Sequence, residues 1–289
     1  MNPATFLLGG DLPVHRIGYG AMRLCGQPGN FGPFADWAAG EKLLRRASEL
    51  GINFVDTAEA YGPGHNEEII AAALHPYPAR LVIATKGGVT KTSPQTVFPD
   101  GRPENLRRAC EASLGRLRVA RIDLYQFHRP DPKVPFADSI GTLATLRAEG
   151  KIRHVGLSNV TLAQIEEARA IVPIVSVQNR FNLRERGAED VLDYCERNAI
   201  AFLPFGPLGA QPFERHAPLT AHDGSLAAIA TRIGATPAQI ALAWLLHRSP
   251  NVIVIPGTTT ISHLEENSAT AKLDLSDADF ASLSSGRTA

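Results

Sequence analysis

The sequence predicts an α/β protein, a (β/α)8 TIM barrel with an N-terminal β-hairpin and extra C-terminal helices. Three observations indicate this fold. Eight short, nearly continuous apolar runs alternate with longer segments of helical periodicity from end to end. Strand–helix alternation repeated in this way implies parallel strands joined by right-handed crossovers. The length of 289 residues accommodates one such barrel, so we expect a single domain spanning residues 1–289.

The eight apolar runs are rich in Val, Ile and aromatic residues, as strands buried on both faces should be. They are IGYGAM (17–22), INFVDT (52–57), LVIATK (81–86), IDLYQFH (122–128), IRHVGLS (152–158), IVSVQ (174–178), IAFLPF (200–205) and NVIVIPG (251–257). A doubly wound open sheet is the alternative for the same alternation, but such sheets usually have fewer strands.

The segments around and between the strands carry their own signals. TFLLGGDLPV (5–14) contains a Gly-Gly-Asp turn and predicts a hairpin before the barrel, and a further helix is expected after Ser276. The apolar stripe within residues 106–117 has helical spacing. Capping-box spacing at Thr161–Gln164, Thr236–Gln239 and Ser262–Glu265 predicts three helix starts.

Composition excludes several classes of protein. Lysine plus arginine number 29 and aspartate plus glutamate number 29, so the formal net charge is zero, which argues against a nucleic-acid partner or an anionic membrane. The three cysteines are widely spaced and form no CxxC pair, which is typical of a reducing compartment. Neither a signal peptide nor a run of about 18 apolar residues is present. We therefore expect a cytoplasmic protein.

Polar side chains follow the ends of three adjacent expected strands, where barrels of this kind carry their chemistry. Asp56 and Tyr61 follow the second strand, Lys86 ends the third and His128 ends the fourth. Each residue alone has a structural explanation, such as a loop cap, a solvated strand end or a hydrogen-bonded core histidine. Because barrel closure brings the strand ends to one mouth, the set together favours a catalytic site.

These four side chains fit a proton donor for a carbonyl oxygen. Tyrosine has a pKa near 10, and an ammonium about 4 Å away stabilises its anion by roughly 4 kcal/mol at an effective dielectric near 20. That energy equals about three pKa units, so we expect Lys86, held by Asp56, to bring the pKa of Tyr61 near neutrality. His128 is then free to orient the carbonyl.

The attacking species is expected to come from a cofactor. None of the four residues is a convincing nucleophile, and no zinc-type spacing of His and Cys exists, so we expect hydride transfer and no metal. Gly257-Thr258-Thr259 follows the eighth strand and leads into a helix near Ser262, a typical phosphate site. Phe205 is placed to stack on a flat ring, with a role in the core as the equal alternative.

Taken together, these motifs resemble the aldo-keto reductase superfamily over essentially the whole chain. The matching segments are NFVDTAEAYG (53–62), VIATKGG (82–88), YQFHRPDP (125–132), VGLSNV (155–160), VQNRFNL (177–183), FGPLG (205–209) and IPGTTTISHLEEN (255–267). The YPARLVIATKGG and HLEEN regions are also similar to bacterial pyridoxal-reductase-like members of that superfamily.

The resemblance implies reduction of an aldehyde or ketone by NADPH, with pyridoxal as one candidate substrate. It assigns Tyr61 as general acid, Lys86 and Asp56 as the groups that tune it, and His128 as the substrate-orienting residue. Ser158, Asn159 and Gln178 match positions that hold the nicotinamide carboxamide. The further cofactor positions that it implies are Gly20, Met22, Phe205, Gly206, Leu208, Gly257, Thr258, Thr259, His263, Glu266 and Asn267.

One departure from the family pattern concerns the cofactor. Many members carry a Lys and an Arg, which neutralise the 2′-phosphate, where this chain has Gly257 and His263. Thr258, Ser262 and the helix dipole remain available to bind the phosphate. NADPH is the expected cofactor, and the lost cations leave NADH open as the alternative.

The substrate is expected to be a small carbonyl compound bound by Phe31, Phe34, Trp37 and Arg129. For the three aromatic residues, packing of the loop after the first strand is the alternative. Two rival functions remain: a barrel lyase with Lys86 as a Schiff-base lysine, and a non-catalytic regulatory subunit that binds NADPH. The sequence does not fix the oligomeric state.

Overall fold

The structure, a computed structural model, describes residues 4–209 and 224–285. Its centre is a parallel sheet whose seven regular strands follow the order β11-β10-β9-β8-β5-β4-β3. These strands are β3 (Tyr19–Gly20), β4 (Phe54–Asp56), β5 (Val82–Gly87), β8 (Ile122–Phe127), β9 (Ile152–Ser158), β10 (Ile174–Gln178) and β11 (Ala201–Phe202). Each corresponds to one of the first seven apolar runs, and the predicted strand–helix alternation is confirmed.

The eighth apolar run closes the sheet into a barrel. It forms two parallel bridges, Phe202 with Val252 on one side and Ile17 with Val254 on the other. Backbone hydrogen bonds from Gly18 N to Val254 O (2.8 Å) and from Ile253 N to Phe202 O (2.9 Å) accompany them. Because both edges of the sheet meet this run, the barrel replaces the open-sheet alternative.

Two antiparallel hairpins flank the barrel. The N-terminal hairpin pairs β1 (Thr5–Leu8) with β2 (Leu12–His15) through the predicted Gly-Gly-Asp turn. A second hairpin pairs β6 (Val89–Lys91) with β7 (Val97–Pro99) and was not expected from the sequence. It directly follows β5, so it stands over the ends of the strands that carry Lys86 and His128.

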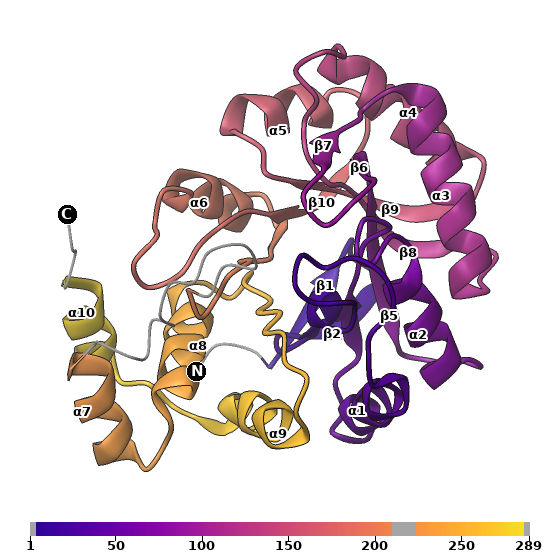
Figure 1. The fold of residues 1–289 in the computed structure, drawn as a ribbon. Coiled ribbons are helices and arrows are strands. Elements are labelled where there is room, and N and C mark those ends of the chain that lie inside the picture. The colour runs from indigo at the N-terminus through magenta and orange to yellow at the C-terminus, as the bar shows by residue number, and fades with distance from the viewer. Residues whose placement is uncertain (1–3, 210–223, 286–289) are drawn as a thin grey trace.

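Helices form an outer ring around the strands, and the C-terminal helix α10 packs against α7 and α8 (Figure 1). The helices are α1 (Trp37–Glu49), α2 (His65–Leu74), α3 (Pro103–Leu117), α4 (Phe136–Ala148), α5 (Leu162–Arg169), α6 (Glu189–Arg197), α7 (Gly224–Ile233), α8 (Pro237–Arg248), α9 (Ile261–Ala269) and α10 (Asp277–Ser285), with 3-10 turns η1 (Ala21–Arg23) and η3 (Thr270–Lys272).

Two of the three predicted capping boxes are present. Thr161 caps α5 with Gln164, and Thr236 caps α8 with Gln239, each with reciprocal side-chain bonds. The prediction for Ser262–Glu265 is wrong, because α9 begins at Ile261 after Thr260, whose side chain makes no capping bond. The Thr258 hydroxyl instead accepts a hydrogen bond from Thr260 N (3.1 Å), which fixes an earlier helix start.

Strand alternation decides which side chains enter the barrel. One apolar cluster lies between sheet and helices, while a second contains inward strand residues and is closed below by Leu8, Leu12 and Val14 of the first hairpin. Towards the carboxyl ends, inward positions change from apolar to polar within two residues: Phe54 to Asp56 in β4, Ala84 to Lys86 in β5, and Leu124 to Gln126 in β8. The core thus leads directly into a polar site.

Among the described helices, none alone is long and apolar enough to cross a membrane. Helices α7 and α8 pass that test of length and composition only as a pair bent by 93°.

Candidate active site

A cavity of about 460 Å³ opens at the carboxyl ends of the barrel strands. Its wall combines residues from every part of the barrel mouth with the β6–β7 hairpin. The predicted site residues on this wall are Gly20, Met22, Asp56, Tyr61, His128, Arg129, Ser158, Asn159, Gln178, Phe205, Gly206, Leu208 and Gly257. A volume of this size falls within the range of small-molecule sites.

Lys86 is fully buried directly behind this wall and organises its centre. Its ammonium donates to Asp56 Oδ1 (2.6 Å), to Thr57 O (2.8 Å) and to Tyr61 Oη (3.3 Å). An ammonium has three N–H donors, so these three acceptors satisfy it completely. The predicted association of Asp56, Tyr61 and Lys86 is therefore present as one hydrogen-bonded unit.

The second oxygen of Asp56 is held by two glutamines. Asp56 Oδ2 accepts hydrogen bonds from Gln126 Nε2 (3.0 Å) and Gln178 Nε2 (2.9 Å). Gly156, the neighbour of Gln126 in β9, leaves the space that Gln126 occupies, since a Cβ there would lie 2.9 Å from Gln126 Cγ. These bonds keep the carboxylate aimed at Lys86.

Gln126 was missed in the sequence, although a signal for it exists. It lies two residues before His128 and two after the inward-facing Leu124, so strand alternation alone places it inside the barrel. The prediction was based on residues at the ends of the expected strands, whereas Gln126 lies two residues before the end of its expected strand. Applying the period of two to every polar residue of β8 finds it.

The pKa of Tyr61 corrects the prediction from the sequence. Burial of the phenol raises its pKa above the usual 10, and this outweighs the lowering by the ammonium of Lys86; the carboxylate of Asp56 raises the pKa further. Burial alone lowers the pKa of Lys86, but Asp56 and Tyr61 raise it above its usual value. At neutral pH the pair is thus a neutral phenol beside a charged ammonium.

His128 faces Tyr61 edge-on, with 5.9 Å between the ring centroids and an interplanar angle of 83°. Burial, the ammonium of Lys86 and the guanidinium of Arg129 together hold the pKa of His128 well below its usual value. Its Nδ1 is buried without a hydrogen-bond partner. The ring is therefore neutral and offers one N–H donor and one acceptor.

The residues expected to hold a nicotinamide carboxamide lie side by side at the ends of β9 and β10, next to His128. Asn159 Nδ2 donates to His128 O (3.1 Å) and to Ser158 Oγ (3.0 Å). Because Gln178 uses Nε2 for Asp56, its Oε1 is the atom left to accept a hydrogen bond from a ligand. The hydroxyl proton of Ser158 is similarly left to donate.

The residues predicted for the adenosine end of a cofactor lie beyond this cavity. Thr258, Thr259, His263, Glu266 and Asn267 are absent from its wall; Thr259 and His263 are exposed, while Thr258 and Asn267 are buried. Helix α9 nevertheless starts four residues after the wall residue Gly257 and presents backbone N–H groups without a side-chain cap. Backbone N–H groups at a helix N-terminus favour anions.

The residues predicted to bind substrate divide into two groups. Arg129 lies on the cavity wall, whereas Phe31, Phe34 and Trp37 do not. Phe34 and Trp37 are half-buried against the core between sheet and helices, and the Trp37 indole donates to Glu41 (2.9 Å) within α1. Their placement matches the packing alternative, because both side chains contact the core and neither lines the cavity.

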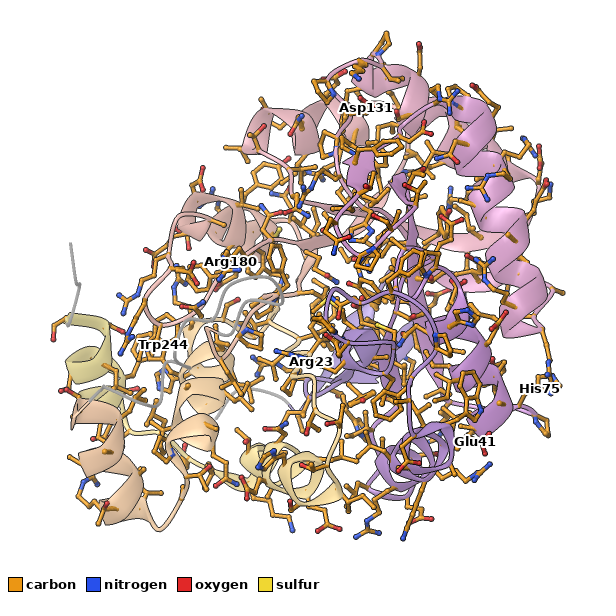
Figure 2. The ribbon with its side chains drawn as sticks, in the orientation of Figure 1. Arg23, Glu41, His75, Asp131, Arg180 and Trp244 are labelled. Carbon is orange, nitrogen blue, oxygen red and sulfur yellow. The ribbon has the colours of Figure 1, made fainter. Side chains whose placement is uncertain are left out.

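Three further cations line the cavity without having been predicted: Arg23, Lys91 and Arg180. Arg23 and Arg180 lie towards the middle of the molecule in Figure 2, unlike His75 at its edge. Arg180 stacks over the Phe205 ring, and its Nη2 is buried without a partner. Both arginines follow strand ends, which is the signal that locates them. A buried guanidinium donor left open suits an anionic ligand.

Gly257 has a physical reason to lack a side chain. A Cβ at this position would lie 2.8 Å from the backbone oxygen of Gly20, and 3.7 Å from Arg23 Cγ. A cation therefore cannot be carried by residue 257 without moving the first strand. Arg23 brings a positively charged side chain to the same place from the 3-10 turn η1 that follows β3.

The family profile of the aldo/keto reductases matches residues 16–286. The chain belongs to the aldo/keto reductase family. It is an oxidoreductase of that family, and the match covers both the barrel and the site just described. Among the described residues, no group of three or more His, Cys, Asp or Glu is placed to hold a metal ion.

Individual relatives agree with this assignment. The chain is 45% identical over 274 residues to an uncharacterized oxidoreductase of Schizosaccharomyces pombe, covering 95% of this chain and 87% of that one. It is 40% identical over 284 residues to pyridoxine 4-dehydrogenase of Escherichia coli, covering 96% of each. An aldo-keto reductase from Klebsiella pneumoniae, solved with NADPH, superposes with a TM-score of 0.80 at 28% identity, covering 98% of this chain and 94% of that one.

Proposed function

We propose that this aldo/keto reductase reduces a small aldehyde or ketone to the alcohol with NADPH, and that Tyr61 is the proton donor. The observation that carries the proposal is the unit of Asp56, Lys86 and Tyr61, in which the fully buried ammonium lies 3.3 Å from the phenol oxygen at the cavity wall. NADPH supplies a hydride to the carbonyl carbon when it is bound.

The residues of the cavity wall fit this cofactor. Ser158 would donate its hydroxyl proton to the carboxamide oxygen, and Gln178 Oε1 would accept from the carboxamide amino group, because these hydrogen-bonding groups are not used within the site. Phe205 would stack on the ring. Arg23, Arg180 and the N–H groups of α9 would bind phosphates, which supports NADPH despite the missing cations at positions 257 and 263.

Proton transfer follows from the electrostatics of the unit. A neutral Tyr61 and a neutral His128 both donate to the carbonyl oxygen and leave its carbon open to attack. As negative charge develops on that oxygen, the proton of Tyr61 moves to it, and Lys86 stabilises the phenolate that remains. Asp56 holds Lys86 in place, so the positive charge need not reorganise during the step.

Pyridoxal is the specific substrate that we propose to test first. The 40% identity with pyridoxine 4-dehydrogenase of Escherichia coli, over 96% of both chains, supports it. The cavity volume of about 460 Å³ also accommodates an aromatic aldehyde of that size.

A panel of aldehydes, pyridoxal included, tests the proposal with NADPH and NADH as separate cofactors. We expect consumption of NADPH with at least one aldehyde, and tighter binding of NADPH than of NADH in fluorescence titrations. Binding of NADPH with no turnover of any aldehyde would contradict the proposal and favour a regulatory subunit.

The Schiff-base alternative is tested by treating the protein with each aldehyde and borohydride. We expect no covalent product at Lys86, because its pKa is raised and the ammonium is not nucleophilic. A trapped adduct at Lys86 would favour the lyase instead.

A further inference from the structure

One side of the active-site cavity has an exposed apolar rim. Val97 and Phe98 of β7 are 45% and 44% exposed, and both line the cavity. Only four large hydrophobic side chains are this exposed among the residues that the structure describes, and these two are adjacent. The register of the hairpin sets Phe98 opposite Thr90 and Val97 opposite Lys91, so the rim is fixed to the end of β5. This apolar pair at the cavity edge offers a surface on which the ring of a bound ligand can pack.

The same side of the cavity has an unbalanced positive charge. Arg129 follows His128 at the end of β8 and is exposed, and no carboxylate in residues 4–209 or 224–285 forms an ion pair with it. Lys91 also lines this side and donates to the backbone oxygen of Asn30 (3.1 Å). Asp56 is the one carboxylate among the described lining residues, and its bonds to Lys86 and two glutamines already occupy it.

This side of the cavity lies across the mouth from Phe205, Leu208 and Gly257, three of the residues assigned to the cofactor. Arg129 and the β6–β7 hairpin extend from β5 and β8, the strands of Lys86 and His128. Phe205, Leu208 and Gly257 follow the seventh and eighth strands across the mouth. Glu185 forms an ion pair with Arg180, and Arg23 lies beside Gly257, where cofactor phosphates are proposed to bind. The charge of Arg129 has no such counterpart among the described residues.

We infer that the enzyme selects aromatic aldehydes that carry an anionic group, a carboxylate or a phosphate, with Val97 and Phe98 against the ring and Arg129 against the anion. The inference rests on the proposed carbonyl reduction and adds a substrate class to it. A guanidinium matches both anions with paired N–H donors, which gives direction as well as charge.

A matched pair of substrates tests the anion. 4-Carboxybenzaldehyde and 4-formylbenzamide have nearly the same shape, and the amide withdraws electrons more strongly, so reactivity alone favours the amide. With NADPH we expect kcat/KM to be about five- to tenfold higher for the carboxylate. The ratio should fall at high salt because Arg129 is exposed. 4-Formylphenyl phosphate shows whether the gain extends to phosphate.

Variants test which residues cause the preference for the carboxylate substrate. In Arg129→Gln the ratio should fall to about one, while Arg121→Gln, which removes the same charge from the opposite end of β8, should retain it. In Phe98→Ala, kcat/KM should fall about tenfold for both aldehydes with the ratio retained. Ile171→Ala, which removes an exposed apolar side chain away from the cavity, should change neither.

Substrate binding to an inactive variant tests the anion preference independently of turnover. In Tyr61→Phe with NADPH present, calorimetry should show tighter binding of 4-carboxybenzaldehyde than of the amide. A wild-type ratio at or below one, or a ratio that survives in Arg129→Gln, would overturn the inference while carbonyl reduction stands. If neither aldehyde is reduced and neither binds, the inference fails; if NADPH consumption is also absent with every aldehyde of the panel, the proposed function fails with it.

Discussion

Two buried cations lie at opposite ends of the barrel, Lys86 at its mouth and Arg16 beside α8 at the start of the first strand. Lys86 is fully buried and Arg16 is 4% exposed. The guanidinium of Arg16 donates to the backbone oxygens of Leu246, Ser249 and Val252, and so ties the start of the first strand to the eighth. Lys86 donates instead to a carboxylate and a phenol as well as to one backbone oxygen.

The pKa values of the two cations diverge accordingly. Burial lowers the pKa of Arg16 to about 10, and its backbone partners keep their protonation state. The pKa of Lys86 is raised by Asp56 and Tyr61 against the effect of burial, so its charge is coupled to groups that gain or lose protons. We infer that a buried cation bonded to backbone serves the fold, and that one bonded to titratable side chains serves chemistry.

Lys86→Met gives the largest expected effect on this comparison. Removing the ammonium leaves no cation beside the developing phenolate, so kcat should fall by about 10²- to 10⁴-fold. The cofactor Kd should change little, because Lys86 is not on the cavity wall. Stopped-flow and fluorescence titration measure the two quantities. A defect confined to cofactor binding would contradict the catalytic role of Lys86.

Arg16→Met should have the opposite pattern. It leaves the carbonyl oxygens of Leu246, Ser249 and Val252 without this donor, and each buried unpaired group costs about 1–3 kcal/mol, so we expect the free energy of unfolding to fall by about 3 kcal/mol. Activity of the folded variant should stay within about threefold, because the site lies at the other end of the barrel. Urea unfolding monitored by circular dichroism measures the change. Unaltered stability with lost activity would contradict the structural role of Arg16.

Gln126→Leu gives the smallest expected effect. Asp56 loses one of two donors to Oδ2 and keeps the other from Gln178, so we expect kcat to fall about fivefold, equivalent to roughly 1 kcal/mol. Gln164→Leu, which alters a glutamine of the α5 capping box, is the control and should not change kcat. Equal rates in wild type and Gln126→Leu would show that Gln126 does not position Asp56.

Much of the fold follows from the sequence, and the failures have physical reasons. The eight apolar runs locate the strands because buried parallel strands need continuous apolarity. The β6–β7 hairpin was missed because its strands have three residues each and lie outside the barrel, where this pattern does not apply. The start of α9 was misplaced because the Thr258 hydroxyl bonds to Thr260 N, a choice that capping-box spacing does not encode.

For the site, the sequence predicts which residues meet but not how their surroundings shift their pKa values. Asp56, Tyr61, Lys86 and His128 meet as the strand ends predict. The direction of the Tyr61 pKa was wrong, because a sequence names the cation nearby but not the loss of solvent around the phenol. The proximity of Arg23 to Gly257 also could not be predicted from the sequence, because 234 positions separate the two residues along the chain.

In the proposed reaction Tyr61 delivers the proton and does not hold the cofactor. Tyr61→Phe keeps the ring and removes the hydroxyl that lies 3.3 Å from Lys86 Nζ. Turnover of an aldehyde that the wild-type enzyme reduces should fall at least about 100-fold, while the Kd for NADPH in fluorescence titration changes by less than about threefold. Unchanged turnover in this variant would contradict the claim.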